Sequence, residues 1–221
     1  MSEGARRIAA EFLGTFGLVF AGCGAVVADE LSGGAVTHVG ISIVFGFIVM
    51  MMVVVFGPVS GAHINPAVTI AFWSAGEFGV REVVPFVVAQ CLGAVAAAAT
   101  LQTLYPESTT LGATLPLAAA GPAFVMEILL TTILMSVILA CAVGHKLTAF
   151  AAGLTIGGTV SLCALFGGPL TGASMNPARS LGPALVSGDL SVLWLYCVAP
   201  VLGALLAVLI HRVVWAGTSP D

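Results

Sequence analysis

The sequence predicts an all-α membrane protein with six transmembrane helices and two short helices that enter the membrane without crossing it. Of its 221 residues, 59% are hydrophobic and only 7% are charged, whereas a soluble domain carries about 25% charged residues. Six apolar segments are long enough to cross a bilayer, which takes about 20 residues of helix. The motif Gly-Ala-x-x-Asn-Pro-Ala occurs once in each half, with the two asparagines 111 residues apart. Lipid is therefore the expected solvent for most of the surface.

The transmembrane helices are predicted from the lengths of the apolar runs. We place them at about 8–28, 37–57, 82–104, 122–143, 148–167 and 192–214. Two further apolar segments, from Pro66 to about Ser74 and from Pro177 to about Val186, are shorter. Each gives about 15 Å of helix at a rise of 1.5 Å per residue, which is half of the hydrocarbon core. They are expected to be half-helices that end near the midplane.

The basic residues predict the orientation. Five of the six lie at the ends of predicted spans: Arg6, Arg7, Arg81, Lys146 and Arg212. If both termini are cytoplasmic, all five fall on the cytoplasmic side, as the positive-inside rule requires. The connection at about 105–121 is then an extracellular loop. The expected location is the plasma membrane or the bacterial inner membrane.

The two halves of the chain repeat one another. Matching residues recur at nearly constant offsets: Glu11 and Glu127, Gly46 and Gly157, Asn65 and Asn176, and Gly93 and Gly203. Each half holds three full spans, an odd number, so the halves enter the membrane from opposite sides. We expect one domain over 1–221, built from inverted repeats at about 1–105 and 118–221.

Each Asn-Pro-Ala triplet has the sequence of a helix start. Asparagine is a good N-cap, and proline is favoured at the first helical position. The triplets are Asn65, Pro66 and Ala67, and Asn176, Pro177 and Ala178. A helix start at mid-membrane is costly unless its backbone lines a water-filled cavity. We expect the preceding runs, 57–61 and 167–172, to be extended and to present a row of carbonyl acceptors.

These features together predict a pore with carbonyl acceptors on one wall and apolar side chains on the other. Two asparagine amides and the positive ends of two half-helices meet at its centre. Cations meet a barrier there and hydronium is excluded, whereas neutral molecules that form hydrogen bonds can pass.

Four charged or titratable residues accompany the motifs. Arg179 follows the second triplet and would cost at least about 2.5 kcal/mol in a membrane segment unless it faces water or a partner. It is expected to donate to solutes and repel cations near the extracellular mouth; the alternative is a structural arginine that fixes a loop carbonyl.

Glu11 and Glu127 are interpreted as acceptors for backbone N–H groups of the re-entrant loops, with a proton relay as the alternative. His63 is interpreted as a hydrogen-bonded loop residue, with gating as the alternative.

Other classes of function have little support. No nucleophile–base set is visible, so an enzyme is not predicted, and the net charge of −4 argues against nucleic acid as a partner. The five cysteines lie singly in apolar runs, which is typical of small packing residues, and no metal or cofactor site is predicted. An ion-coupled secondary transporter stays open as an alternative, although Glu11 and Glu127 lie at span ends rather than at the centre.

The motifs resemble those of the aquaporin (major intrinsic protein) family. The resemblance is carried by the runs 60–69 (SGAHINPAVT) and 172–180 (GASMNPARS), and it covers nearly the whole chain. It implies six membrane helices plus two half-helices, a pore in each subunit, and a homotetramer in membrane lipid. It also implies passive transport of water and small uncharged solutes.

The resemblance further implies a selectivity filter at four positions, which by counting from the asparagines are Phe45, Ala164, Ala173 and Arg179. Water-selective members usually carry histidine at the Ala164 position and a small polar residue or cysteine at the Ala173 position. Two alanines imply a wider, less polar filter, and a water-selective channel stays open as the alternative.

The run 168–185 looks closest to the plant nodulin-like intrinsic proteins and their bacterial relatives. That subfamily passes water, glycerol and neutral metalloid acids such as boric, silicic or arsenous acid. Phe45 departs from its common filters, which have tryptophan or a small residue there. Ser180, Ala184 and the pair Tyr196-Cys197 depart from glycerol facilitators, which carry aspartate, a basic residue and Pro-Leu at these positions.

Overall fold

The fold is described from a computed structural model, which covers residues 1–117 and 119–215. Eight α-helices follow one another: α1 (Glu3–Leu31), α2 (Thr37–Ser60), α3 (Pro66–Ala75), α4 (Val80–Leu104), α5 (Ala120–Leu139), α6 (Ala149–Thr171), α7 (Pro177–Ser187) and α8 (Leu193–Val214). A π-helical turn, η1 (Ala140–Gly144), prolongs α5. Six of these helices are long and apolar enough to cross a membrane, which confirms the predicted fold class. Position 118 and the segment 216–221, which belong to the predicted second repeat, lie outside the described residues.

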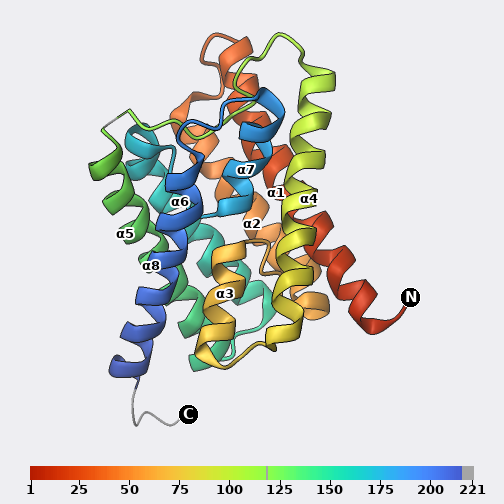
Figure 1. Cartoon of the computed structure of the whole chain (residues 1–221), viewed down its shortest axis with the longest axis vertical. Helices are drawn as coiled ribbons and strands as arrows, with labels where there is room; N and C mark the ends of the chain where they lie inside the picture. Colours follow the sequence, from red (N-terminus) through yellow and green to blue (C-terminus); the bar gives the residue numbers. More distant parts are fainter. Residues whose placement is uncertain (118, 216–221) are drawn as a thin grey trace.

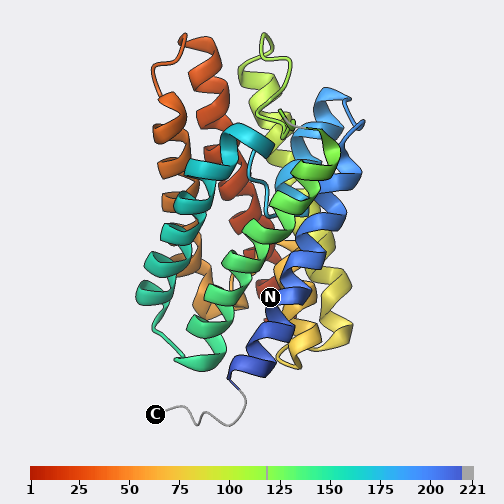
Figure 2. The same ribbon diagram turned by 90° about the vertical axis from the view of Figure 1, so that its left-hand side faces the viewer.

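The six long helices surround the two half-helices (Figure 1). The order of two long helices, one short and one long occurs twice along the chain. In Figure 1, α3 lies in the lower half of the molecule and α7 in the upper half, and Figure 2 shows the long helices running side by side in a bundle. The half-helices therefore approach the middle of the molecule from opposite ends, as the sequence predicts.

Glycines at matching positions let the long helices cross closely. A Cβ on Gly46 in α2 would lie 2.4 Å from the carbonyl oxygen of Gly157 in α6, and a Cβ on Gly157 would lie 2.4 Å from that of Gly46. In the same way, a Cβ on Gly93 would lie 2.3 Å from the carbonyl oxygen of Phe12, and one on Gly203 would lie 2.3 Å from that of Ile128. No side chain larger than hydrogen fits at these crossings, since real Cβ atoms do not approach backbone so closely.

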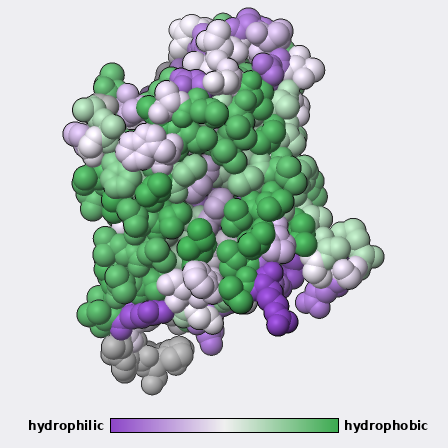
Figure 3. Space-filling model, viewed as in Figure 1, coloured by the Kyte–Doolittle hydropathy of each residue, from purple (hydrophilic) through white to green (hydrophobic). Residues whose placement is uncertain are grey.

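The outer surface carries a broad apolar band between two polar ends (Figure 3). Large apolar side chains on different long helices are exposed there, for example Val84 on α4, Leu129 on α5 and Leu162 on α6. A soluble monomer rarely exposes so large a continuous apolar surface. Together with the six long apolar helices, this band is that of a multi-pass membrane protein.

One expectation about the backbone is wrong. The runs 57–61 and 167–172 were predicted to be extended, but α2 continues to Ser60 and α6 continues to Thr171. Pro58 and Pro169 lie inside the last turns, and each helix ends at a glycine in the left-handed conformation, Gly61 with φ 91° and Gly172 with φ 81°. Proline removes only its own N–H bond, and continued helix satisfies the remaining backbone groups where water is scarce.

Candidate functional site

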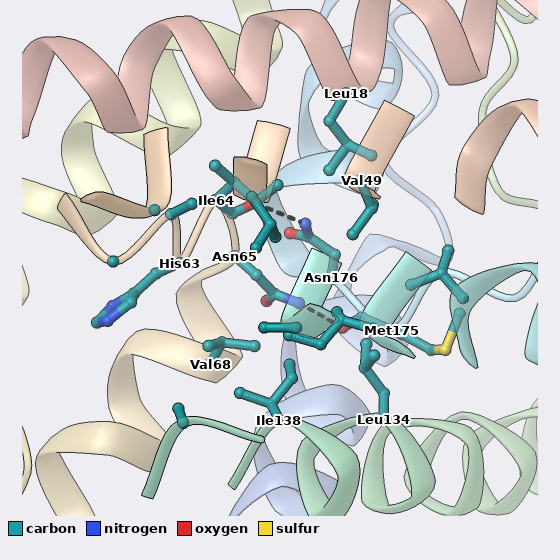
Figure 4. Close-up of a pocket in the computed structure, with 18 of the residues that line it drawn as sticks. Leu18, Val49, His63, Ile64, Asn65, Val68, Leu134, Ile138, Met175 and Asn176 are labelled. Atoms are coloured by element: carbon teal, nitrogen blue, oxygen red, sulfur yellow. Dashed lines mark hydrogen bonds between the residues drawn. The ribbon is translucent and has the colours of Figure 1, made fainter. Parts of the chain in front are cut away.

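A cavity of about 390 Å³ runs through the centre of the bundle. Both re-entrant segments contribute to its wall, including Ala62, Asn65, Ala173 and Asn176. Much of the remaining wall is apolar and comes from α2, α5 and α6, for example Val49, Leu134 and Val160. Figure 4 shows part of this lining, with Asn65 and Asn176 near each other at its middle. We call it the central cavity.

The two asparagines cap their own half-helices and also bind the opposite loop. Oδ1 of Asn65 accepts from the backbone N–H of Ala67 at 2.9 Å, and Oδ1 of Asn176 accepts from that of Ala178 at 3.0 Å. Nδ2 of Asn65 donates to the carbonyl of Met175 at 2.8 Å, and Nδ2 of Asn176 donates to the carbonyl of Ile64 at 2.9 Å (Figure 4). Since an amide carries two N–H groups, each side chain keeps one for a passing molecule.

The cross-links between the loops are a feature that the sequence does not predict. The two asparagine amides lie at the centre as predicted. One of the two N–H groups of each amide, however, donates to the loop of the other repeat. The signal for this pairing is the repeat itself, because each asparagine and its acceptor lie on different halves of the chain.

The loops before the asparagines have an uncommon backbone. Ala62 and Ile64 have φ angles of 47° and 43°, and Ala173 and Met175 have φ angles of 41° and 52°. Positive φ strains residues other than glycine by about 1–3 kcal/mol each, so surrounding contacts must hold them in place. The predicted row of carbonyl acceptors along 57–61 and 167–172 is therefore wrong for the helical part of these runs, and only the short loops that follow are non-helical.

Glu11 supplies such contacts for the first loop. One carboxylate oxygen accepts from the Ser60 hydroxyl at 2.7 Å and from the His63 N–H at 2.9 Å. The other accepts from the Ile64 N–H at 2.7 Å and from Nε2 of Gln90 at 2.7 Å. The side chain is fully buried. Its geometry is that of a loop anchor, with the lone pairs occupied by donors.

Glu127 has the same contacts in the second loop. One of its oxygens accepts from the Thr171 hydroxyl at 2.7 Å and from the Ser174 N–H at 2.9 Å, and the other accepts from the Met175 N–H at 2.9 Å. The hydroxyl of Tyr196, which is fully buried on α8, donates to the Thr171 carbonyl at 2.6 Å. The two acids therefore act on matching backbone positions of the two repeats.

His63 packs in an aromatic cluster at the base of the first loop. Its ring lies 4.8 Å from the rings of Phe72 and Phe78 and 5.4 Å from that of Phe86, between centroids. Nδ1 is 3.1 Å from the hydroxyl of Thr69. Figure 4 shows the ring pointing away from the two asparagines. These contacts are those of a packed, hydrogen-bonded loop residue.

Arg179 lies in the first turn of α7 and is 4% exposed. A terminal guanidinium nitrogen donates to the carbonyl of Gly112 at 2.8 Å, and Cζ lies 4.9 Å from the centroid of the Phe45 ring. In residues 1–117 and 119–215, Nε of Arg179 is buried and has no hydrogen-bond partner. The side chain thus both fixes a loop carbonyl and lines the central cavity.

The loop that holds Arg179 is the connection between α4 and α5, which folds back into the molecule. Leu111 is buried, a Cβ on Gly112 would lie 2.9 Å from Cα of Cys23, and Thr114 donates to the Ser180 hydroxyl at 2.7 Å. Sequence reasoning identifies this stretch only as an extracellular connection. No local pattern marks Gly112, because its role depends on partners in α1 and α7.

The four positions predicted as a filter come together in the structure. Phe45 on α2, Ala164 on α6, Ala173 in the second loop and Arg179 on α7 all line the central cavity. Ala164 and Ala173 are 8% and 7% exposed. Neither alanine carries a polar side chain, so the cavity wall is apolar at these two positions.

Comparisons with known proteins agree with this geometry. The family model described as major intrinsic protein matches residues 1–211. Aquaporin NIP1-1 of Zea mays is 46% identical over 200 residues, which are 90% of this chain and 71% of that protein. Nodulin-26 of Glycine max is 42% identical over 210 residues, which are 95% of this chain and 78% of that protein.

A solved structure has the same fold. The X-ray structure of the aquaglyceroporin from Plasmodium falciparum matches with a TM-score of 0.90 and 27% identity, over 96% of this chain and 97% of that one. The resemblance to nodulin-like intrinsic proteins is confirmed by the relatives, and the inverted bundle by the solved structure. The chain belongs to the major intrinsic protein (aquaporin) family, whose members are membrane channels rather than enzymes.

Proposed function

We propose that the chain is a passive channel for water and small uncharged solutes, with a wide filter that admits glycerol or neutral metalloid acids. The filter consists of Phe45, Ala164, Ala173 and Arg179. The metalloid acids are boric, silicic and arsenous acid, which carry several hydroxyl groups and no charge when protonated.

The observation that supports this proposal is the pair of alanines in the cavity wall. Ala164 and Ala173 line the central cavity beside Arg179. A methyl group takes less room than a histidine ring and offers no hydrogen bond. The level of the filter therefore leaves space for a solute larger than water, while the guanidinium of Arg179, which lines the same cavity, can donate to one of the hydroxyl groups of the solute.

Ions and protons are excluded at the paired Asn-Pro-Ala motifs. The N-termini of α3 and α7 each carry roughly half a positive charge, and both point at the asparagine pair. A cation or hydronium is repelled there, and Arg179 repels cations further toward the extracellular mouth. A neutral molecule gains one N–H from Asn65, one from Asn176 and carbonyls from the loops.

The chain acts as one domain over 1–221, with inverted repeats at about 1–105 and 118–221. It assembles as a homotetramer with one pore in each subunit. It resides in the plasma membrane or the bacterial inner membrane, with both termini in the cytoplasm. The charges at the helix ends support this orientation. Arg7 pairs with Glu82 at the start of α4, Arg212 donates to the Ser74 carbonyl near the end of α3, and Lys146 lines a pocket together with His211 and Glu77.

The names of the similar proteins bear on the solute. The solved structure is that of an aquaglyceroporin, and the relatives are aquaporins of the NIP group together with nodulin-26. These names favour a channel that is not restricted to water.

The test is stopped-flow light scattering on proteoliposomes that contain the purified chain. We expect both rapid water flux and measurable uptake of glycerol or arsenous acid, relative to empty liposomes. Water flux without uptake of either solute would leave the water-selective alternative and would contradict the proposed passage of these solutes.

A further inference from the structure

The repeat relates the two ends of the central cavity. The offset of 111 residues between Asn65 and Asn176 also relates each proposed filter residue to a residue of the other half. The pairs are Phe45 and Ile156, Ala164 and Val53, Ala173 and Ala62, and Arg179 and Val68. All eight residues line the central cavity. We call Val53, Ala62, Val68 and Ile156 the mirror ring.

The correspondence holds in the backbone as well as in the sequence. Ala62 and Ala173 each follow the glycine that ends a long helix, and their φ angles are 47° and 41°. Val68 and Arg179 are each the third residue of a half-helix. The mirror ring is therefore built from the same structural positions as the filter.

The ring lies on the opposite side of the asparagine pair from the filter. α3 and α7 enter the middle of the molecule from opposite ends, so Val68 and Arg179 lie on opposite sides of their meeting point (Figure 1). A molecule that crosses the channel must pass both levels, with the asparagines between them.

The chemistry of the two levels differs. The filter has a guanidinium with an unpartnered Nε in the described part of the chain. All four side chains of the mirror ring are hydrocarbons, and their exposed fractions are 8% for Val53, 7% for Ala62, 3% for Val68 and 9% for Ile156. A solute that enters an apolar constriction loses hydrogen bonds to water, and the hydrocarbon wall offers none in return. Such a constriction therefore opposes passage by the loss of water as well as by its size.

The neighbouring helices differ between the two levels. The Phe45 ring packs directly against Gly22 of α1. A Cβ on Gly22 would lie only 2.2 Å from Cε1 of that ring, so the glycine provides the space that the phenyl ring occupies. The offset between Glu11 and Glu127 relates Gly22 to Ile138 of α5. Ile138 lines the central cavity itself and projects from α5 (Figure 4). At the matching place α5 therefore adds an apolar side chain to the cavity wall, where α1 has a glycine.

We propose that the mirror ring is a second selectivity constriction, at which Ile156 and Val53 set the largest uncharged solute that the channel conducts. This proposal rests on the proposed wide filter. It assigns the size limit to an apolar level on the cytoplasmic side, because two alanines have removed that limit from the filter.

The experiment compares four substitutions in proteoliposomes, with water, glycerol and the larger polyol erythritol as probes. Ile156→Ala widens the ring, and Ile156→Phe narrows it. Leu154→Ala is the matched control, since Leu154 lies on the same helix and is 56% exposed on the outer surface. Val53→Ala is a second widening variant on another helix, so that a folding defect in one of them leaves the test intact.

We expect Ile156→Ala and Val53→Ala to raise the ratio of erythritol to water permeability by at least about threefold, and Ile156→Phe to lower glycerol flux by a similar factor. Leu154→Ala should change neither. In the Ala164→His background the gain from Ile156→Ala should disappear, because two constrictions in series are limited by the narrower one.

Unchanged ratios in both widening variants, with water flux intact, would overturn the mirror ring but leave the wide filter standing. If the unmodified chain and both widening variants conduct water only, the proposed function fails as well. If the unmodified chain conducts water only but the widening variants conduct glycerol, the ring is supported and the filter is wide.

Discussion

At Ala164 a single methyl group stands where water-selective members of the family usually carry histidine, and it lines the central cavity beside Arg179. The substitution Ala164→His adds an imidazole donor and fills the space next to the guanidinium. We expect it to lower glycerol or metalloid flux by about tenfold while water flux falls by less than half, since water is smaller and gains a hydrogen-bonding partner. Permeabilities of both probes from the same proteoliposomes measure this. Equal loss of both fluxes would count against Ala164 as a residue that lines the filter.

Glu127 and Glu11 are buried acids that anchor the two re-entrant loops. Each holds two backbone N–H groups of a strained loop, and glutamine can accept with only one of its two terminal atoms. Glu127→Gln should therefore destabilise the protein by about 1–3 kcal/mol, the cost of leaving a buried donor without an acceptor.

Thermal unfolding in detergent, followed by tryptophan fluorescence, measures that loss. Glu77→Gln is the control, because Glu77 is an exposed acid beyond the end of α3. The anchoring role would be refuted if Glu127→Gln and Glu77→Gln melted at the same temperature.

Among the elements, the half-helices are the ones that sequence predicts best. An asparagine N-cap followed by proline at the first helical position is a local signal, and it places the starts of α3 and α7 correctly. The lengths of the apolar runs predict the six long helices for a similar reason, because the bilayer thickness requires them.

Some features of the helices and loops could not be predicted from the neighbouring sequence. Pro58 and Pro169 suggested extended chain, but each lies in the last helical turn, where only one N–H bond is lost. The π-helical turn at 140–144 and the inward fold of the connection around Gly112 depend on tertiary partners. The positions that line the central cavity were reached through the family resemblance, whereas the cross-links from Asn65 and Asn176 to the opposite loops were not predicted at all.

α2 and α6 cross closely at Gly46 and Gly157. A Cβ on Gly46 would lie 1.8 Å from the Ser161 hydroxyl oxygen and 2.4 Å from the Gly157 carbonyl, so Gly46→Ala must push the two helices apart. We expect a loss of at least about 3 kcal/mol and little folded channel in the membrane, because overpacking at backbone contacts relaxes poorly. Gly158→Ala is the control, since a Cβ there meets nothing within 4 Å. Yields and melting temperatures of the two variants measure this, and equal values would show that the crossing tolerates separation.

For the whole molecule, the two inverted halves explain why polar groups at mid-membrane are tolerated. Each half brings a strained loop, a buried glutamate and a capping asparagine, and each asparagine satisfies a carbonyl of the other half. The remaining N–H and carbonyl groups line a cavity instead of lipid. The inversion also sets the positive ends of two half-helices against each other. In the function proposed above, this arrangement repels cations from either side and lets neutral molecules pass without a step that is coupled to an ion.

The most direct test of this account is the flux of water and glycerol into proteoliposomes with and without an imposed proton or sodium gradient, with a pH-sensitive dye inside. A passive wide-filter channel predicts rapid flux of both molecules, rates that do not depend on either gradient, and no proton entry above that of empty liposomes. Solute flux that follows the gradient, or proton entry that accompanies water, would contradict it.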